Sequence, residues 1–247
     1  MSTVKVSDLH TGYGPVDVLQ GIDLSTEGAK ICAILGPNGS GKTTLIRTIT
    51  GQLPPRVGTI WLDGEEITGM PAHRIAHLGV ATVPQGRGIF GELSVIDNLK
   101  MGVYVMGDRS GFGERVEAIY ERFPILYERT TQLAGSLSGG EQMMLAVARA
   151  MISSPKLLIL DEPSEGLAPM IVEQVFEDIS SFAHSEGGRV VLVEQNVRQT
   201  LKVAERVFVL VQGRIVASGT PDDFASPDDL MHLYLTSQPS NEVPLDG

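Results

Sequence analysis

The stretch Gly36-Pro37-Asn38-Gly39-Ser40-Gly41-Lys42-Thr43 lies between an apolar segment, Lys30 to Leu35, and a helical segment, Thr43 to Thr50. It matches G-x-x-x-x-G-K-[ST] in the strand-loop-helix context that a phosphate-binding loop requires. Glycines let backbone N–H groups converge on phosphate oxygens, and the helix N-terminus adds a partial positive charge. We therefore predict a nucleotide site in which Lys42 contacts the β- and γ-phosphates and the Thr43 hydroxyl binds Mg²⁺.

A second motif, a pair of acidic residues, also supports a nucleotide site. Asp161 and Glu162 directly follow the apolar run Leu157 to Leu160, which suits a strand covered on both faces of a parallel sheet. We predict that Asp161 holds Mg²⁺, directly or through water, and that Glu162 orients and polarises the attacking water. Alone, the pattern is equally typical of a strand end followed by solvated charges. The phosphate-binding loop favours the nucleotide interpretation.

A third motif separates this chain from other proteins with such a loop. Leu137-Ser138-Gly139-Gly140-Glu141-Gln142 precedes a helical segment and stands ahead of Asp161. Ser138 is a good helix N-cap, and an exposed helix N-terminus binds anions. A cap alone does not need this whole string, which resembles the signature motif of ABC-transporter ATPases. The resemblance implies that Ser138 to Gln142 face the γ-phosphate held by an opposite subunit, so that two subunits enclose two ATP molecules.

The resemblance covers nearly the whole chain and assigns further positions. Tyr13 stands where an aromatic ring stacks on adenine, although by itself it would be an ordinary aromatic near a turn. Gln85 matches a glutamine that contacts Mg²⁺ and the attacking water. Gln195 stands where most members have a histidine that contacts the γ-phosphate, and glutamine can donate a hydrogen bond there but cannot become cationic. Ala168 replaces an aspartate that crosses the dimer interface in many members.

These assignments give three groups of candidate residues. The expected ATP contacts are Tyr13, Gly36, Pro37, Asn38, Gly39, Ser40, Gly41, Lys42, Thr43 and Thr44. The expected catalytic residues are Glu162, Gln85 and Gln195, and the expected Mg²⁺ ligands are Thr43, Gln85 and Asp161. The expected contacts to ATP of the opposite subunit are Ser138, Gly139, Gly140, Glu141 and Gln142.

Two strings resemble one branch of the family, the ATP-binding subunits of branched-chain amino-acid importers. They are Asp161 to Pro169 and Val193-Glu194-Gln195-Asn196. Glu165 departs from that branch, where an apolar residue is usual. Gln85 agrees better with the related urea-type subunits, because amino-acid-type members often have glutamate there. The cargo therefore stays open among branched-chain amino acids, urea and short amides.

Bulk properties limit the class of protein. The 247 residues suit one large α/β domain with an insertion, and a net charge of -11 disfavours binding to nucleic acid. Cys32 is the one cysteine, so no internal disulfide is expected. No apolar run reaches the roughly 18 residues that a membrane span needs. We expect a cytoplasmic protein, peripheral on the inner face of the cell membrane.

The expected fold is a P-loop NTPase (RecA-like) α/β core with an antiparallel β portion and an inserted helical subdomain. The core would comprise residues 1–85 and 153–225, the helical subdomain residues 86–152, and a C-terminal helix and flexible tail residues 226–247. Expected helices in and after the insertion are Asp97 to Val105, Glu114 to Arg122, Glu141 to Ile152 and Pro169 to Phe182.

The resemblance implies an ATP-hydrolysing importer subunit. Its partners would be a second ABC ATPase, identical or different, two transmembrane permeases and, indirectly, a solute-binding protein. A non-transport ABC-type ATPase usually carries two cassettes or a long coiled coil, and this chain has neither. A catalytically silent regulator would not need Lys42, Gln85 and Glu162 together. A small-molecule kinase would leave Ser138 to Gln142 unexplained.

Overall fold

A six-stranded sheet forms the centre of the computed structural model, which describes residues 3–104, 111–185 and 187–224. The strand order is β10-β9-β3-β8-β7-β6, and all neighbours are parallel except β10 and β9. The strands are β3 (Ile31–Leu35), β6 (Val80–Val83), β7 (Leu157–Asp161), β8 (Arg189–Glu194), β9 (Arg206–Val211) and β10 (Arg214–Gly219).

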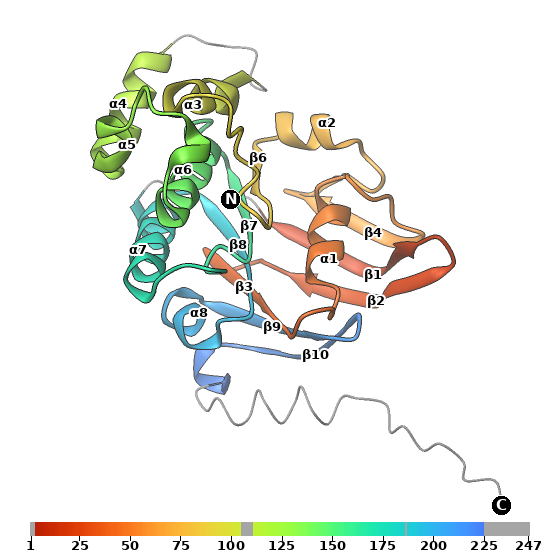
Figure 1. Cartoon of the computed structure of the whole chain (residues 1–247). Coiled ribbons are helices and arrows are strands. Elements are labelled where there is room, and N and C mark those ends of the chain that lie inside the picture. The colour runs from red at the N-terminus through yellow and green to blue at the C-terminus, as the bar shows by residue number, and fades with distance from the viewer. Residues whose placement is uncertain (1–2, 105–110, 186, 225–247) are drawn as a thin grey trace, which may run out of the picture.

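A smaller antiparallel sheet, with strand order β2-β1-β4-β5, lies to one side of it (Figure 1). Its strands are β1 (Val4–Tyr13), β2 (Val16–Ser25), β4 (Val57–Leu62) and β5 (Glu65–Glu66). The alternation of apolar and polar residues by itself indicates only Val4 to Leu9 and Ile22 to Ser25 as strands in the part of the sequence that forms β1 and β2. The strands are longer because shifts in the β1–β2 register interrupt the alternation without ending the pairing.

Most helices lie on one side of the central sheet or beyond its β6 end (Figure 1). The described α-helices are α1 (Lys42–Ile49), α2 (Ala72–His77), α3 (Val95–Tyr104), α4 (Phe112–Arg122), α5 (Pro124–Glu128), α6 (Gly139–Met151), α7 (Pro169–Ser185) and α8 (Val197–Val203). Two short 3-10 helices, at Ala134–Ser136 and Pro221–Phe224, complete the description. The predicted C-terminal helix and tail, from 226 onward, lie outside the described residues.

The apolar run of β7 is buried on both faces of the sheet. Leu158 and Leu160 pack with the helices α3 to α7, whereas Leu157 and Ile159 pack with α1 and the antiparallel sheet. All four side chains are at most 1% exposed. Burial on both faces explains why this strand contains no alternating polar residues. It also makes the carboxyl end of β7 a rigid support for the two acids that follow Leu160.

Candidate nucleotide-binding and hydrolysis site

Four neighbouring strands end at the same edge of the central sheet. The register pairs Leu35 of β3 with Glu194 of β8, Val193 of β8 with Asp161 of β7, and Leu160 of β7 with Val83 of β6. Ligands of open α/β sheets bind at this carboxyl edge. The segments after these strands carry the predicted phosphate loop, Gln195, Glu162 and Gln85 respectively.

Two glycines of the predicted phosphate loop, Gly36 and Gly41, lie too close to neighbouring atoms for a larger residue. A Cβ on Gly36 would lie 2.2 Å from the Leu210 backbone oxygen and 2.7 Å from Ser40 Oγ. Gly41 has a φ of 107°, in the left-handed region that favours glycine. The loop borders a cavity of about 360 Å³. Its lining residues are Val18, Asn38, Gly39, Gly41, Lys42, Thr43, Thr44, Gln85 and Glu162.

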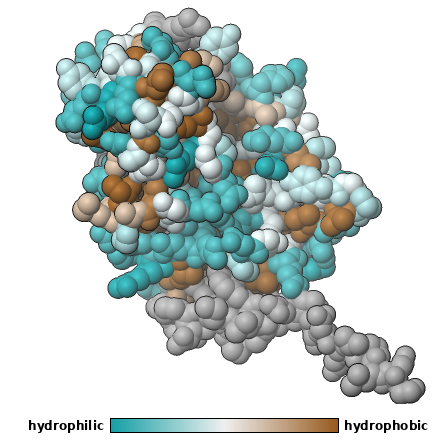
Figure 2. All heavy atoms as spheres, in the orientation of Figure 1, coloured by the Kyte–Doolittle hydropathy of each residue, from teal (hydrophilic) through white to brown (hydrophobic). Residues whose placement is uncertain are grey.

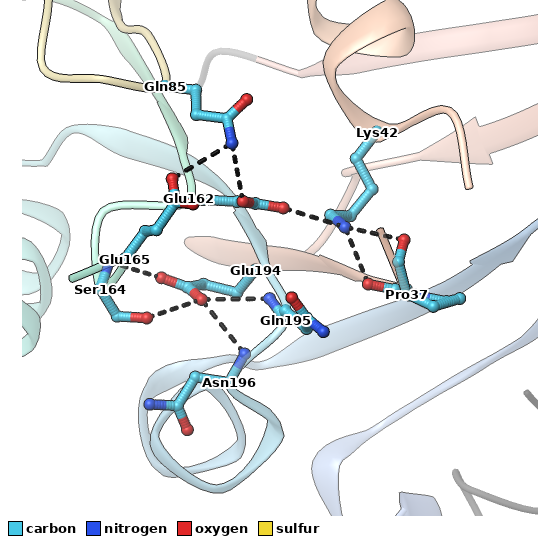
Figure 3. A network of polar contacts seen from close by, with 10 residues as sticks. Pro37, Lys42, Gln85, Glu162, Ser164, Glu165, Glu194, Gln195 and Asn196 are labelled. Atoms are coloured by element: carbon cyan, nitrogen blue, oxygen red, sulfur yellow. Dashed lines mark hydrogen bonds and ion pairs between the residues drawn. The ribbon is translucent and has the colours of Figure 1, made fainter. Parts of the chain in front are cut away.

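Lys42, the first residue of α1, turns its side chain back over this loop. Its Nζ donates hydrogen bonds to the backbone oxygens of Gly36 at 2.8 Å and Pro37 at 3.0 Å. The same Nζ lies 3.0 Å from Glu162 Oε1 (Figure 3). The structure therefore joins two residues that the sequence placed in separate motifs. In a buried setting such an ion pair offsets the cost of removing both charges from water.

Glu162 also meets Gln85. Gln85 Nε2 donates to Glu162 Oε2 at 3.2 Å and to Glu165 Oε2 at 3.1 Å (Figure 3). Lys42, Glu162, Gln85 and Glu165 thus form one continuous polar chain. The contact with Glu165 does not follow from the sequence pattern, in which this residue is only a departure from the amino-acid-type branch.

Asp161 is buried at the end of β7, with 2% of its surface exposed. Burial raises its pKa to about 6, and a hydrogen bond with the Thr43 side chain partly offsets this rise. Its Oδ1 has no hydrogen-bond partner within the described part of the chain. A carboxylate oxygen left without a partner beside a hydroxyl is a donor set that suits Mg²⁺, which usually combines one or two carboxylates with substrate phosphates.

Tyr13 ends β1 on the side of α1 and is 44% exposed. Arg47 Nη1 donates to the Tyr13 hydroxyl at 3.3 Å. Hydrogen bonds with the Thr44 side chain and with Arg47 lower the pKa of Tyr13 below its ordinary value. The ring is therefore held next to α1, and its exposed surface is available for stacking.

Gln195 follows β8 and lines a second cavity, of about 270 Å³, together with Glu162. The other lining residues are Ser164, Glu165, Glu194 and Asn196. Beneath the cavity the Glu194 carboxylate accepts hydrogen bonds from neighbouring backbone groups (Figure 3). The sequence singled out Gln195 but assigned no role to Glu194, because a strand-end acid does not reveal its partners.

The predicted signature segment lies apart from these groups. Ser138 caps α6: Glu141 N donates to its Oγ at 3.3 Å, and Ser138 N donates to Glu141 Oε2 at 2.7 Å. Arg87 Nη1 donates to Gln142 Oε1 at 2.6 Å, which links this helix to the segment after Gln85. Among the described residues, none from 138 to 142 lines the cavities beside Lys42 or Gln195.

Comparison with known proteins decides the family. The family model described as ABC transporter matches residues 19–165. The chain belongs to the ABC transporter family. It is an ATP-binding cassette, and the expected ABC-type ATPase class is confirmed.

This cassette is 44% identical to the high-affinity branched-chain amino acid transport ATP-binding protein BraG of Pseudomonas aeruginosa, over 95% of this chain and 99% of BraG. It is 37% identical to the probable branched-chain amino acid transport ATP-binding protein LivF of Archaeoglobus fulgidus, over 95% and 98% of the two chains. The solved ATP-binding cassette MJ1267 superimposes with a TM-score of 0.84 at 25% identity, covering 95% of this chain and 99% of MJ1267. The predicted fold is confirmed.

Proposed function

We propose that this cassette is the ATP-hydrolysing subunit that powers an importer for branched-chain amino acids. The observation that carries the hydrolytic part is the convergence of Lys42, Glu162 and Gln85 at the carboxyl edge of one sheet. The cargo rests on similarity to BraG and LivF, whose names specify branched-chain amino acids.

The residues of this polar chain have different roles at the phosphates of ATP. Lys42 exchanges its contact with Glu162 for the phosphate oxygens, which leaves the Glu162 carboxylate ionised and free to accept a proton from water. Gln85 orients the water from the opposite side, and Gln195 donates a neutral hydrogen bond to the γ-phosphate. Mg²⁺, held by Thr43 and Asp161 with Gln85 nearby, would supply neutralisation of developing phosphate charge.

Adenine and the opposite subunit complete the proposed site. Tyr13 offers a partly exposed ring for stacking on adenine. The segment from Ser138 to Gln142 lies away from the cassette's own phosphate loop, so it is free to meet ATP bound by a second cassette. A capped helix N-terminus preceded by glycines suits that contact with phosphate oxygens.

A cavity of about 600 Å³ suggests where a permease docks. Its walls include residues of α2, β6, α3 and α6, and Figure 1 shows the three helices around β6. Arg149 lines it with a buried Nη1 that has no hydrogen-bond partner in the described part of the chain, and its guanidinium lies over the Phe90 ring. We propose that permease subunits engage this cavity and the adjoining residues 86–95.

Association with such permeases would place the cassette on the cytoplasmic face of a cell membrane. Among the described residues no helix is both long and apolar enough to cross a bilayer. The face shown in Figure 2 is mostly hydrophilic, with its apolar patches separate from one another. Attachment through protein partners fits such a surface better than direct insertion into lipid.

An importer for urea or short amides is the second candidate. Gln85 favours it, since urea-type subunits have glutamine at this place. Because an ATPase of this kind does not touch the cargo, the distinction must come from the associated solute-binding protein.

Purification of the tagged cassette from detergent-solubilised native membranes tests the proposal. Two permeases, a second ATPase and a solute-binding protein should be recovered with it. Titration of that binding protein with leucine and with urea then decides the cargo. Recovery of ribosomes or DNA-repair proteins without any permease would overturn the transport assignment while leaving ATP hydrolysis untouched.

A further inference from the structure

Glu194 is a buried acid that the mechanism above does not use. It is the last residue of β8, and only 1% of its surface is exposed. An ionised carboxylate is costly to bury unless hydrogen bonds replace its water. Burial raises the pKa of Glu194, and hydrogen bonds from Ser164 and from the Asn196 and Gln195 backbone oppose that rise.

Within the described part of the chain, the Glu194 carboxylate accepts four hydrogen bonds. Oε1 accepts from Ser164 N at 2.8 Å, and Oε2 accepts from Ser164 Oγ at 2.9 Å (Figure 3). Oε2 also accepts from the backbone N–H groups of Gln195 at 3.1 Å and Asn196 at 3.2 Å. One carboxylate therefore ties the segment that follows β7 to the turn that follows β8.

The tied segment contains Glu162 in a strained conformation. Glu162 has a φ of 53°, a left-handed value that costs free energy for a residue with a Cβ and persists only when its surroundings hold it. Its N–H donates to Val193 O of β8 at 2.8 Å, and Ser164, two residues later, is bound by Glu194. Strand β8 thus holds the backbone on both sides of the Glu162 side chain.

We propose that Glu194 is a positioning residue for ATP hydrolysis, fixing Glu162 through Ser164 and Gln195 through its backbone N–H so that both face one cavity. Both side chains line the cavity of about 270 Å³ described above. The inference rests on the ATP-hydrolysing part of the proposed function and is independent of the cargo.

Glu194→Gln is the most informative variant because it keeps the shape and removes only the second acceptor. Whichever way the amide is turned, its NH₂ faces at least one backbone N–H that can only donate. We expect kcat for Mg-ATP to fall about tenfold while KM for ATP stays within about twofold, since the interaction lost acts on the transition state rather than on substrate binding. The assay uses the complex recovered from native membranes.

Ser164→Ala provides a milder matched variant. It removes the Oγ donor but leaves the Ser164 N–H in place, so kcat should fall only about threefold. If the two residues act through one contact, Ser164→Ala should add little in the Glu194→Gln background, because coupled pairs are not additive. Glu66→Gln, an exposed acid on β5, controls for the loss of one charge and should match the native chain.

The outcomes separate the two proposals. Native kcat in Glu194→Gln overturns the positioning role while the proposed ATPase stands, whereas absence of ATP hydrolysis by the native complex overturns both. Parallel losses of ATP affinity, kcat and melting temperature would show a purely structural role and also overturn the inference. If Glu194→Gln does not fold, Ser164→Ala decides: a reduced kcat with unchanged KM supports the proposal, and native kcat overturns it.

Discussion

Lys42 Nζ lies 3.0 Å from Glu162 Oε1, and the two side chains are only 4% and 9% exposed. The proposed phosphate-binding cation, Lys42, and the proposed catalytic base, Glu162, therefore form an ion pair that is buried from solvent. Removing one member of a buried ion pair leaves an uncompensated charge. Loss of the charge at either position should accordingly change the electrostatic environment of the partner that remains.

Glu162→Gln should retain ATP binding and lose most turnover. The amide keeps the side-chain shape, and its one oxygen can still accept a hydrogen bond from Lys42, but it cannot take a proton from water. We expect kcat to fall about a hundredfold or more, as is typical when a general base is removed. Steady-state hydrolysis and nucleotide affinity of the complete complex provide the check. Native turnover would contradict the role assigned to Glu162.

Asp161→Asn should stabilise the chain in Mg²⁺-free buffer at neutral pH. Because the pKa of Asp161 is raised to about 6, ionised Asp161 lowers stability above that pH, and the penalty shrinks as pH falls towards the unfolded-state value. Replacement should raise the free energy of unfolding by up to about 3 kcal/mol at pH 7. Denaturant unfolding at pH 7 and pH 5 should show a smaller gain at the lower pH.

Asp178→Asn offers a matched control for that experiment. Asp178 on α7 also has a pKa raised to about 6 by burial, and its Oδ2 lacks a partner in the described part of the chain. It should likewise gain stability at pH 7. Only Asp161→Asn should weaken Mg²⁺-dependent ATP binding, and an equal weakening in both variants would argue against Asp161 as a metal ligand.

Gly36→Ala should disrupt the phosphate loop. The added Cβ would meet the Leu210 backbone oxygen at 2.2 Å, and backbone cannot move aside as a flexible side chain can. We expect ATP affinity to fall at least about tenfold, the loss that follows when binding groups are displaced. Gly113→Ala, where nothing lies within 4 Å, is the control and should retain native affinity. Equilibrium binding of a fluorescent ATP analogue measures both.

Tyr13→Phe and Tyr13→Ala separate the ring from the hydroxyl. Phenylalanine loses the hydrogen bond from Arg47 but keeps the stacking surface, so ATP affinity should change little. Alanine removes the ring and should lower the affinity for ATP about fivefold to tenfold, in line with an aromatic contact of about 1 kcal/mol. Equal effects of the two variants would assign the role to the hydroxyl.

The sequence predicted the parts of the site that depend on local pattern. The phosphate loop, the acid-tipped strand β7 and the capped start of α6 each have a residue order that requires a particular backbone. Short helices such as α2 and α5 were missed because six or five residues carry too little periodicity. The Lys42–Glu162 ion pair could not be foreseen, since it depends on the directions of two side chains, one at the start of α1 and one just after β7.

The buried acid at the end of β8 illustrates a second limit. Sequence alone cannot distinguish a solvated strand end from a carboxylate with four donors, because the donors come from loops whose approach is set by the sheet register. Glu165 is a similar case. Its hydrogen bond with Gln85 depends on the left-handed turn at Glu162, which no residue preference announces.

The proposed hydrolytic site and the 600 Å³ cavity are built from residues that differ in burial. Lys42, Glu162 and Gln195 follow the strands β3, β7 and β8, whose residues are almost all buried, so a change in these strands disturbs the core. The walls of the 600 Å³ cavity also include exposed residues, such as His77 of α2 and Met101 of α3. Exposed residues of the proposed docking surface can therefore change with less cost to the core than the strands that support the proposed hydrolytic site.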